Sequence, residues 1–211
     1  MPRETFRRLK PAKKQQVIAG LTTVFTRLGY DKATVADIVK TCGIPRGSFY
    51  QYFNHKYDAF LAVIDEAQHK KMAYLDGLIK RIGQEPFFDL YYAMVDAGIA
   101  FAKAHPDYVA VWVGFFASRD PGMQSAWRDF EHRSVTLLET YLRKDQAAGF
   151  IRNDVNTLAL SRLLYRFQSI DIMDAFLAGK SVDEMQTMAR QTIDIIRHGI
   201  EEETHGKNTG I

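Results

Sequence analysis

Apolar residues recur at intervals of three and four along most of the chain, which is the spacing of one face of an α-helix. The first such segment begins near Pro11 and ends at Gly29. Its apolar stripe consists of Val17, Leu21, Val24, Phe25 and Leu28. No segment shows the alternation of a β-strand, and no internal repeat is present. The pattern therefore predicts an all-α protein.

Residues 34–60 carry the signals of two short helices joined by a tight turn. Thr34 can cap the first helix through its hydroxyl, and Asp37 three residues later completes a capping-box pattern. Gly43 supplies the backbone freedom that ends this helix, and Pro45 suits the opening of the next one. Two helices this close in sequence must cross steeply, which predicts a helix-turn-helix.

Each of these two helices has an apolar face and a polar face. The inward residues are Val35, Ile38 and Val39 on the first helix and Phe49, Tyr52 and Phe53 on the second. The outward residues of the second helix are Arg46, Gly47, Tyr50 and Gln51. Because the outward side chains can donate and accept hydrogen bonds, they can reach bases and phosphates.

A linking helix is expected from about residue 56 to 80, where Tyr57, Phe60, Leu61 and Ile64 begin a new stripe. Further helices are expected over three ranges bounded by proline and glycine signals, namely 87–104, 107–117 and 121–148.

The last two predicted helices are the most apolar. Gly149 ends the preceding helix, and Asp154 can cap one helix that continues to Leu177. Ser181 and Glu184 form a second capping-box pattern at the start of the final helix. The stripe of that helix consists of Met185, Met188, Ala189, Thr192, Ile195, Ile196 and Ile200. The tail from residue 201 onward is polar, and we expect it to fray.

Two helices this apolar have more hydrophobic surface than one subunit easily covers, so we expect a homodimer formed through them. The alternative is that both helices pack wholly inside the subunit.

The net charge of +3 is unevenly distributed along the chain. Residues 1–60 contain 11 Lys and Arg against 4 Asp and Glu, whereas residues 61–211 contain 17 against 21. A basic N-terminal end suits binding to phosphates, and an acidic remainder keeps the rest of the protein off the duplex. The alternative is a solvated basic surface with no partner, but the helix-turn-helix pattern in the same residues favours DNA.

Other features narrow the location and the chemistry. The longest apolar run, residues 108–117, is half of the roughly 20 residues that cross a bilayer. The basic N-terminus is not followed by an apolar segment, so we expect a cytoplasmic protein with no membrane contact. Cys42 is the single cysteine, which excludes an intramolecular disulfide and favours a buried packing role over a redox sensor.

The segment from Cys42 to Phe53, with Thr34 before it and Lys56 after it, resembles the TetR family of bacterial transcriptional regulators. Direct resemblance covers residues 13–60, and the remainder is similar in length, helical character and the turn over residues 149–154. The resemblance implies a three-helix DNA-binding domain over residues 1–56. It also implies a larger helical ligand-binding and dimerisation domain over residues 57–205, with the last two helices pairing in a homodimer.

Arg46 is the best candidate for a base contact, because its guanidinium can bind guanine O6 and N7 together. Ser48 and Gln51 are secondary candidates, and Gly47 lets the backbone approach the duplex. The resemblance implies contacts to phosphate or thymine methyl groups from Tyr50 and Tyr52, and to phosphate from Thr34 and Lys56. For Tyr52, a role in the core is an equal alternative.

Basic residues before and within the first helix could form an arm along phosphates or in the minor groove, or could be solvated charge. These residues are Arg3, Arg7, Arg8, Lys10, Lys13 and Lys14.

An effector site is expected among the helices in the middle of the chain, because the resemblance implies a cavity there and apolar walls with a few polar groups form small-molecule sites. The candidate residues are Met94, Phe101, Trp112, Phe115, Phe116, Met123, Trp127, Tyr165, Gln168 and Ser169. They predict a small apolar or aromatic effector. The alternative is that these stripes are ordinary core.

No catalytic constellation is present. The segment 178–181 resembles the end of a phosphate-binding loop, but such a loop needs glycine at Asp174. The sequence has no G-x-S-x-G, and no two of its six histidines are spaced i, i+4. We expect no enzyme activity, no cofactor and no metal. The leading hypothesis is a ligand-responsive repressor that binds a palindromic operator of double-stranded DNA as a homodimer. The alternative is an interaction protein of the same fold that acts through protein partners.

Overall fold

A computed structural model of the protein describes residues 2–82 and 84–199. The described residues form helices with no β-strand, and a single isolated β-bridge joins Ile82 to Glu85. This arrangement confirms the predicted all-α class. The helices are α1 (Glu4–Arg7), α2 (Pro11–Lys32), α3 (Val35–Cys42), α4 (Arg46–Tyr52), α5 (Lys56–Ile79), α6 (Phe87–Ala104), α7 (Pro106–Ala117), α8 (Pro121–Ala147), α9 (Thr157–Arg166), the π-helical turn η1 (Phe167–Asp171), α10 (Ile172–Leu177) and α11 (Val182–His198).

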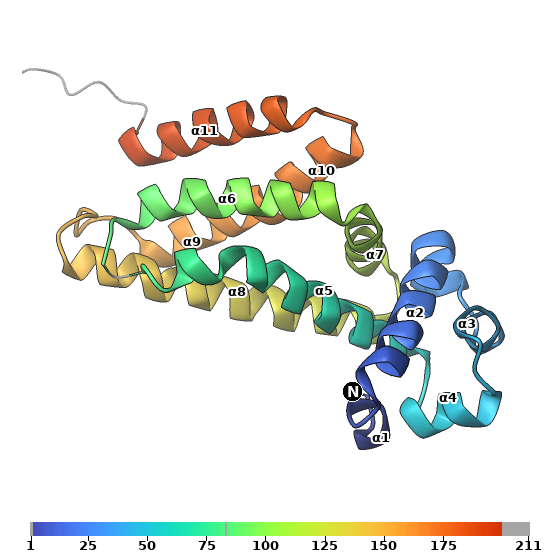
Figure 1. Ribbon diagram of the computed structural model, residues 1–211. Helices are drawn as coiled ribbons and strands as arrows, with labels where there is room; N and C mark the ends of the chain where they lie inside the picture. The colour runs from blue at the N-terminus through green and yellow to red at the C-terminus, as the bar shows by residue number, and fades with distance from the viewer. Residues whose placement is uncertain (1, 83, 200–211) are drawn as a thin grey trace, which may run out of the picture.

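Figure 1 shows that α1 to α4 gather at one end of the molecule, while α5 leaves this end and runs beside α6. Helix α11 lies along α6 on the outer side of the larger part. We call residues 2–55 the N-terminal module and residues 56–199 the effector region. The division at residue 56 remains a prediction, and the predicted end at residue 205 and Ile200 lie outside the described residues.

Buried apolar side chains form two clusters. The first joins α1 to α4 to the first half of α5, to α7 and to the start of α8, and it includes Leu21, Phe49, Phe60 and Phe115. The second holds α6, the end of α8 and the segments from α9 to α11 together. Because the first cluster contains residues from both regions, the N-terminal module is attached to the effector region by shared apolar packing.

Helix α2 extends beyond its predicted end. Gly29 has φ 67° and ψ 171°, a left-handed backbone that favours glycine, and the helix resumes after it as far as Lys32. Gly29 therefore interrupts the regular helix at the predicted position, but α2 continues beyond it.

The sequence did not predict α1. Phe6 is buried, and its ring centroid lies 4.8 Å from that of Phe53 and 6.1 Å from that of Tyr52. The backbone N–H of Arg3 donates to the carbonyl of Tyr52 at 2.9 Å, and Arg3 Nε donates to Asn54 Oδ1 at 2.8 Å. The N-terminal segment is therefore packed against the end of α4.

Two predictions for the C-terminal helices were wrong. Asn156, not Asp154, caps α9 by accepting a hydrogen bond from the N–H of Ala159 at 2.9 Å, and Asp154 instead pairs with Arg152 at 3.4 Å. The predicted single helix up to Leu177 is interrupted by η1, a wider turn that reorients the side chains after it.

The capping box at Ser181 and Glu184 is confirmed, but the predicted stripe of α11 needs correction. The buried side chains are Met185, Ala189 and Ile193, whereas Ile195 is 56% exposed. The apolar residues at 195 and 193 lie on different faces of the helix, and only tertiary packing distinguishes the buried one.

Candidate DNA-binding and effector sites

The predicted capping box fixes the start of α3. The Thr34 hydroxyl accepts a hydrogen bond from the N–H of Asp37 at 3.2 Å, and the Thr34 N–H donates to Asp37 Oδ2 at 3.0 Å. The Thr34 hydroxyl also donates to Asp37 Oδ2 at 2.5 Å. These hydrogen bonds hold the pKa of the Asp37 carboxyl below its ordinary value. Gly43 ends α3 in a left-handed conformation with φ 61°, as its position predicted.

Helix α3 packs very closely on α2 at one point. A Cβ atom added to Gly20 would lie 2.6 Å from Cys42 Sγ and 2.8 Å from Cys42 Cα. Gln16 Nε2 donates to the carbonyl of Cys42 at 3.0 Å, which ties the same two helices together. Burial raises the pKa of the Cys42 thiol to about 11, so the thiol is protonated and unreactive at neutral pH, as expected for a packing residue.

The outward face of α4 is where the sequence predicted it. Arg46, Gly47 and Gln51 are exposed, Ser48 is half-buried, and Tyr50 is 41% exposed. The Arg46 guanidinium lies 6.0 Å from the centre of the Tyr50 ring, and no described residue forms an ion pair with it. Its hydrogen-bond donors are therefore available to a ligand.

Tyr52 differs from the other predicted DNA contacts. Its side chain is only 8% exposed and belongs to the same apolar cluster as Phe49 and Phe53. This location supports the alternative in which Tyr52 serves mainly as core.

Lys56 is held at the junction between α2 and α5. Its Nζ donates to the carbonyl of Tyr30 at 2.7 Å and to that of Asp31 at 3.3 Å, and it lies 4.3 Å from the centre of the Tyr30 ring. An ammonium group has three donors, so one N–H remains for a phosphate. Sequence reasoning did not foresee this structural role.

Side-chain hydrogen bonds also connect the N-terminal module to the effector region. The Thr26 hydroxyl donates to the carbonyl of Asp107 at 3.1 Å, and the Ser118 hydroxyl donates to Asp31 Oδ1 at 2.8 Å. Both contacts join α2 to the ends of α7. Movement of α7 can therefore reach the module directly, in addition to movement of α5.

Four of the predicted effector residues come together in a cluster of aromatic rings where α7 meets α8. Trp127 lies 6.1 Å from Trp112, 5.5 Å from Phe115 and 5.2 Å from Phe116, measured between ring centroids. Phe130, one turn along α8, lies 4.9 Å from Trp112.

The predicted effector residues differ widely in burial and position. Phe101, Phe115 and Met123 are buried in the first apolar cluster, and Met94 is buried outside both clusters. Phe116 is 46% exposed. Gln168 and Ser169 lie half-buried in η1, one turn after the buried Tyr165. Which of them contact an effector remains a prediction.

Two open hollows in the described part of the chain lie elsewhere. One, of about 420 Å³, is lined by Tyr30, His55, Lys56, Tyr57, Asp120 and Gly122 at the junction of α2, α5 and α8. The other, of about 350 Å³, lies between α1, α2 and α5. Neither contains a predicted effector residue.

Further observations exclude some kinds of site within the described part of the chain. There, no group of three or more His, Cys, Asp and Glu side chains is arranged to hold a metal ion. No helix of the described ranges combines the length and apolarity needed to cross a membrane.

Comparison with known proteins agrees with this geometry. Residues 17–63 match the bacterial regulatory proteins of the tetR family. The HTH-type transcriptional regulator YvdT of Bacillus subtilis is 23% identical over 184 residues, which cover 87% of this chain and 90% of that protein. The HTH-type transcriptional repressor Rv1474c of Mycobacterium tuberculosis is 22% identical over 191 residues, which cover 90% of this chain and 93% of that protein.

The fold is also that of a solved regulator. The crystal structure of FadR from Bacillus subtilis in complex with stearoyl-CoA matches with a TM-score of 0.72 over 89% of this chain and 99% of that one, at 13% identity. These proteins are named as regulators, in agreement with the prediction that the chain is not an enzyme. Residues 17–63 therefore match the DNA-binding domain of the tetR family of bacterial transcriptional regulators, and the chain as a whole is similar to regulators in sequence and in fold.

Proposed function

We propose that this regulator is a cytoplasmic repressor that binds a palindromic operator as a homodimer and releases it when a small apolar or aromatic effector binds. The observation that carries the proposal is the exposed face of α4, where Arg46 stands beside Tyr50 without an ionic partner. A guanidinium in this position can read guanine in the major groove.

Charge and neighbouring contacts support DNA as the partner. The first 60 residues carry most of the excess positive charge, which favours phosphates. We assign base contacts to Arg46, Ser48 and Gln51. We assign contacts with the DNA backbone to Tyr50 and to the remaining N–H of Lys56. Gly47 allows the helix to approach the duplex closely. Thr34 contributes mainly by capping, because its hydroxyl already bonds Asp37.

The homodimer is supported by apolar side chains left exposed on the C-terminal segments. Leu163 on α9 is 51% exposed, Leu177 on α10 is 52% exposed, and Ile195 on α11 is exposed as well. A second copy would cover these residues by an isologous contact. It would also place two α4 helices on successive half-sites, about 34–36 Å apart.

Release of DNA would follow from movement of α5 and α7, which both contact the module. An effector that prefers the released arrangement would shift the equilibrium toward it. FadR, whose fold is similar, was solved with stearoyl-CoA, which supports a small-molecule effector here.

The test is binding to a DNA fragment selected from genomic DNA with the wild-type protein. Arg46→Ala should weaken binding by about 1–3 kcal/mol and relax the preference at one base pair. Arg128→Ala removes an exposed arginine from α8 and is the matched control with no expected effect. An equal loss on every sequence would refute base reading by Arg46. A wild type that selects no DNA would favour the alternative of an interaction protein.

The dimer is tested separately by gel filtration with light scattering. We expect twice the chain mass of 24.1 kDa. A monomer at micromolar concentration would contradict the dimer.

A further inference from the structure

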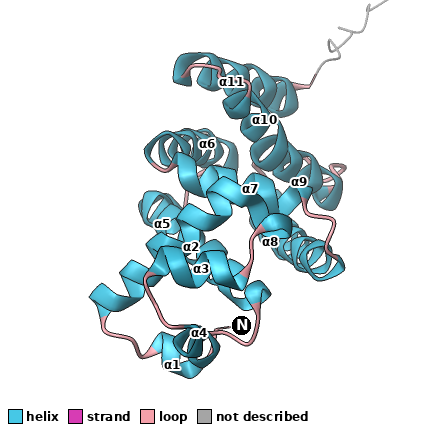
Figure 2. Ribbon diagram, turned by 90° about the vertical axis from the view of Figure 1, so that its right-hand side faces the viewer, coloured by secondary structure: helices cyan, strands magenta, loops and turns pink. Residues whose placement is uncertain are grey.

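Helix α4 carries the proposed base contacts, but it is too short to hold its own position. It has seven residues, which is about two turns, and an isolated helix of this length is not stable in water. It packs on α3 and on α1, and α1 lies beside it in both views of the molecule (Figures 1 and 2). The position of its outward face therefore depends on the contacts that these neighbours make.

The N-terminal segment holds the last turn of α4. The backbone N–H of Arg3 donates to the carbonyl of Tyr52 at 2.9 Å. This carbonyl belongs to the end of the helix, where carbonyls have no partner within the helix itself. The buried ring of Phe6 covers the same end, with its centroid 4.8 Å from that of Phe53. The segment thus contributes both a hydrogen bond and apolar packing to the end of α4.

A network of side chains continues this contact into α5. Arg3 Nε donates to Asn54 Oδ1 at 2.8 Å, and Asn54 Nδ2 donates to Asp58 Oδ2 at 3.0 Å. The backbone N–H of Asn54 donates to the same carboxylate oxygen at 3.1 Å. Asp58 lies in the first turn of α5, and its side chain is only 1% exposed. Asn54 therefore uses both ends of its amide to join the N-terminal segment to α5, across the loop that follows α4.

We propose that Arg3 and Asn54 are positioning residues, which hold α4 for operator binding and are anchored on the buried carboxylate of Asp58. Arg3 acts through the hydrogen bonds that it donates, and its charge is not what operator binding requires. Base contacts need donors placed within hydrogen-bond distance of the base edges, so a displaced α4 loses affinity for the operator before it loses affinity for DNA in general. This inference rests on the proposed function, because it concerns the same DNA site.

A matched pair of substitutions at position 3 separates the hydrogen bond from the charge. Glutamine places its amide nitrogen where arginine has Nε, so Arg3→Gln removes the charge and keeps a donor. Arg3→Met has a similar length and removes both. The measured quantity is the ratio of affinities for the fragment selected by the wild type and for an unrelated duplex. Arg3→Met should lower this ratio by about tenfold, whereas Arg3→Gln should keep it within about threefold of the wild type.

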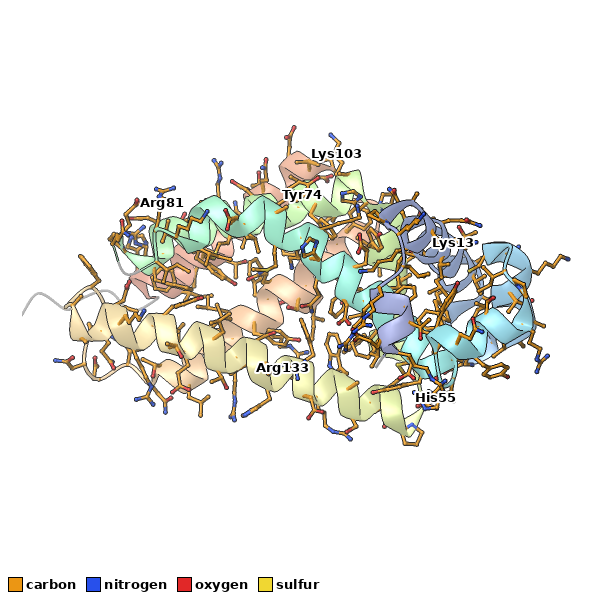
Figure 3. The ribbon with its side chains drawn as sticks, turned by 60° about the horizontal axis from the view of Figure 1, so that its bottom comes forward. Lys13, His55, Tyr74, Arg81, Lys103 and Arg133 are labelled. Atoms are coloured by element: carbon orange, nitrogen blue, oxygen red, sulfur yellow. The ribbon has the colours of Figure 1, made fainter. Side chains whose placement is uncertain are left out.

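Lys103→Met is the matched control, because Lys103 is an exposed lysine on α6 that extends into solvent (Figure 3). It should leave the ratio unchanged. If Arg3→Gln lost as much affinity as Arg3→Met, the charge and not the donor would be responsible, and the proposal would be overturned. The proposal would also be overturned if neither change at position 3 altered the ratio.

Asn54→Ala tests whether the two residues act as one unit. It should lower the ratio at least as much as Arg3→Met does. Adding Arg3→Met to Asn54→Ala should then change the ratio by less than about twofold, because the side chain of Arg3 acts through Asn54. Two losses that multiply in full would contradict the network.

Hydrogen exchange of the free protein provides a second measurement that needs no DNA. The backbone N–H groups of residues 49–53 should exchange about threefold or more faster in Arg3→Met than in the wild type, while those of α2 should not change. Unchanged exchange in α4 would overturn the proposal even if the ratio fell. A wild type that selects no DNA refutes the proposed function, and the exchange data separately decide whether Arg3 and Asn54 hold α4.

Discussion

Gly20 in the N-terminal module is buried and Gly98 in the effector region is half-buried, and their surroundings are opposite. At Gly20 an added Cβ would meet the backbone of Cys42 at 2.8 Å, whereas at Gly98 it would meet nothing within 4 Å. The first glycine allows two helices to touch, and the second borders open space. The comparison indicates that α2 and α3 touch at Gly20, whereas α6 can accept a larger side chain at position 98.

The polar groups differ in the same way. At the start of α5, Lys56 bonds two carbonyls of the module, and within the module Thr34 bonds Asp37, so both side chains have partners. In the effector region, Lys71 forms no ion pair with another described residue.

The largest expected effect concerns the core of the module. Phe49→Ala should lower the free energy of unfolding by about 3–5 kcal/mol, because its ring is fully buried in the first cluster. Gln51→Ala, on the exposed face of the same helix, is the control and should change stability little. Urea denaturation measures both. A small loss for Phe49→Ala would mean that the module is not tightly packed.

The two glycines give the direct test. Gly20→Ala should destabilise the protein by about 1–3 kcal/mol, because the backbone of Cys42 would have to move. Gly98→Ala should instead stabilise it by about 0.5–1 kcal/mol, because alanine favours the helix and meets no obstacle. If both changes had the same sign in thermal denaturation, the contrast between the regions would be wrong.

Both regions contain a helix that begins with a capping box, so substitutions there test whether helix initiation is alike in the two regions. Thr34→Ala and Ser181→Ala should each cost about 1 kcal/mol, because each removes the acceptor for an N–H in the first turn of a helix. Similar losses for the two variants would show that the regions differ in tertiary packing and not in helix initiation. A loss confined to Thr34→Ala would contradict this interpretation.

The smallest expected effect is the pH dependence of the stability that the two capping boxes contribute. Hydrogen bonds hold the pKa of Asp37 below its ordinary 3.8 and that of Glu184 below 4.5. Each carboxylate therefore contributes stability that is fully present above these ordinary values and is lost as the pH falls through the lowered pKa. Melting temperatures between pH 7 and about pH 3 should fall less steeply for Asp37→Asn and Glu184→Gln than for the wild type. If the melting temperatures of the variants fell as steeply with pH as that of the wild type, these hydrogen bonds would not contribute to stability.

Local signals predicted the module well because each of them acts over a few residues. Thr34 and Asp37 form their box across one helical turn, and Gly43 needs only its own backbone to end α3. Phe49 and Tyr50 were separated correctly because helical spacing turns them about 100° apart, one toward the core and one toward solvent. The N-terminal helix α1 was missed, since its stability depends on Phe6 reaching Phe53, a residue distant in the sequence.

The effector region was harder to predict for a physical reason. Helical spacing identified α6, α7 and α8 closely, but it gave the same weight to Phe115, which is core, and to Phe116, which is exposed. The break at η1 and the cap at Asn156 depend on how α9 fits against its neighbours.

By itself, the sequence determined the helical class, the turn between α3 and α4, the outward position of Arg46 and the concentration of positive charge at one end. Periodicity, capping and composition act over short distances, so they can be recognised without knowing the fold. Only the tertiary structure decided that Tyr52 is core and that Lys56 bonds two carbonyls. Those properties depend on which helices become neighbours and how closely they approach, and contacts of this kind are made between residues far apart in the chain.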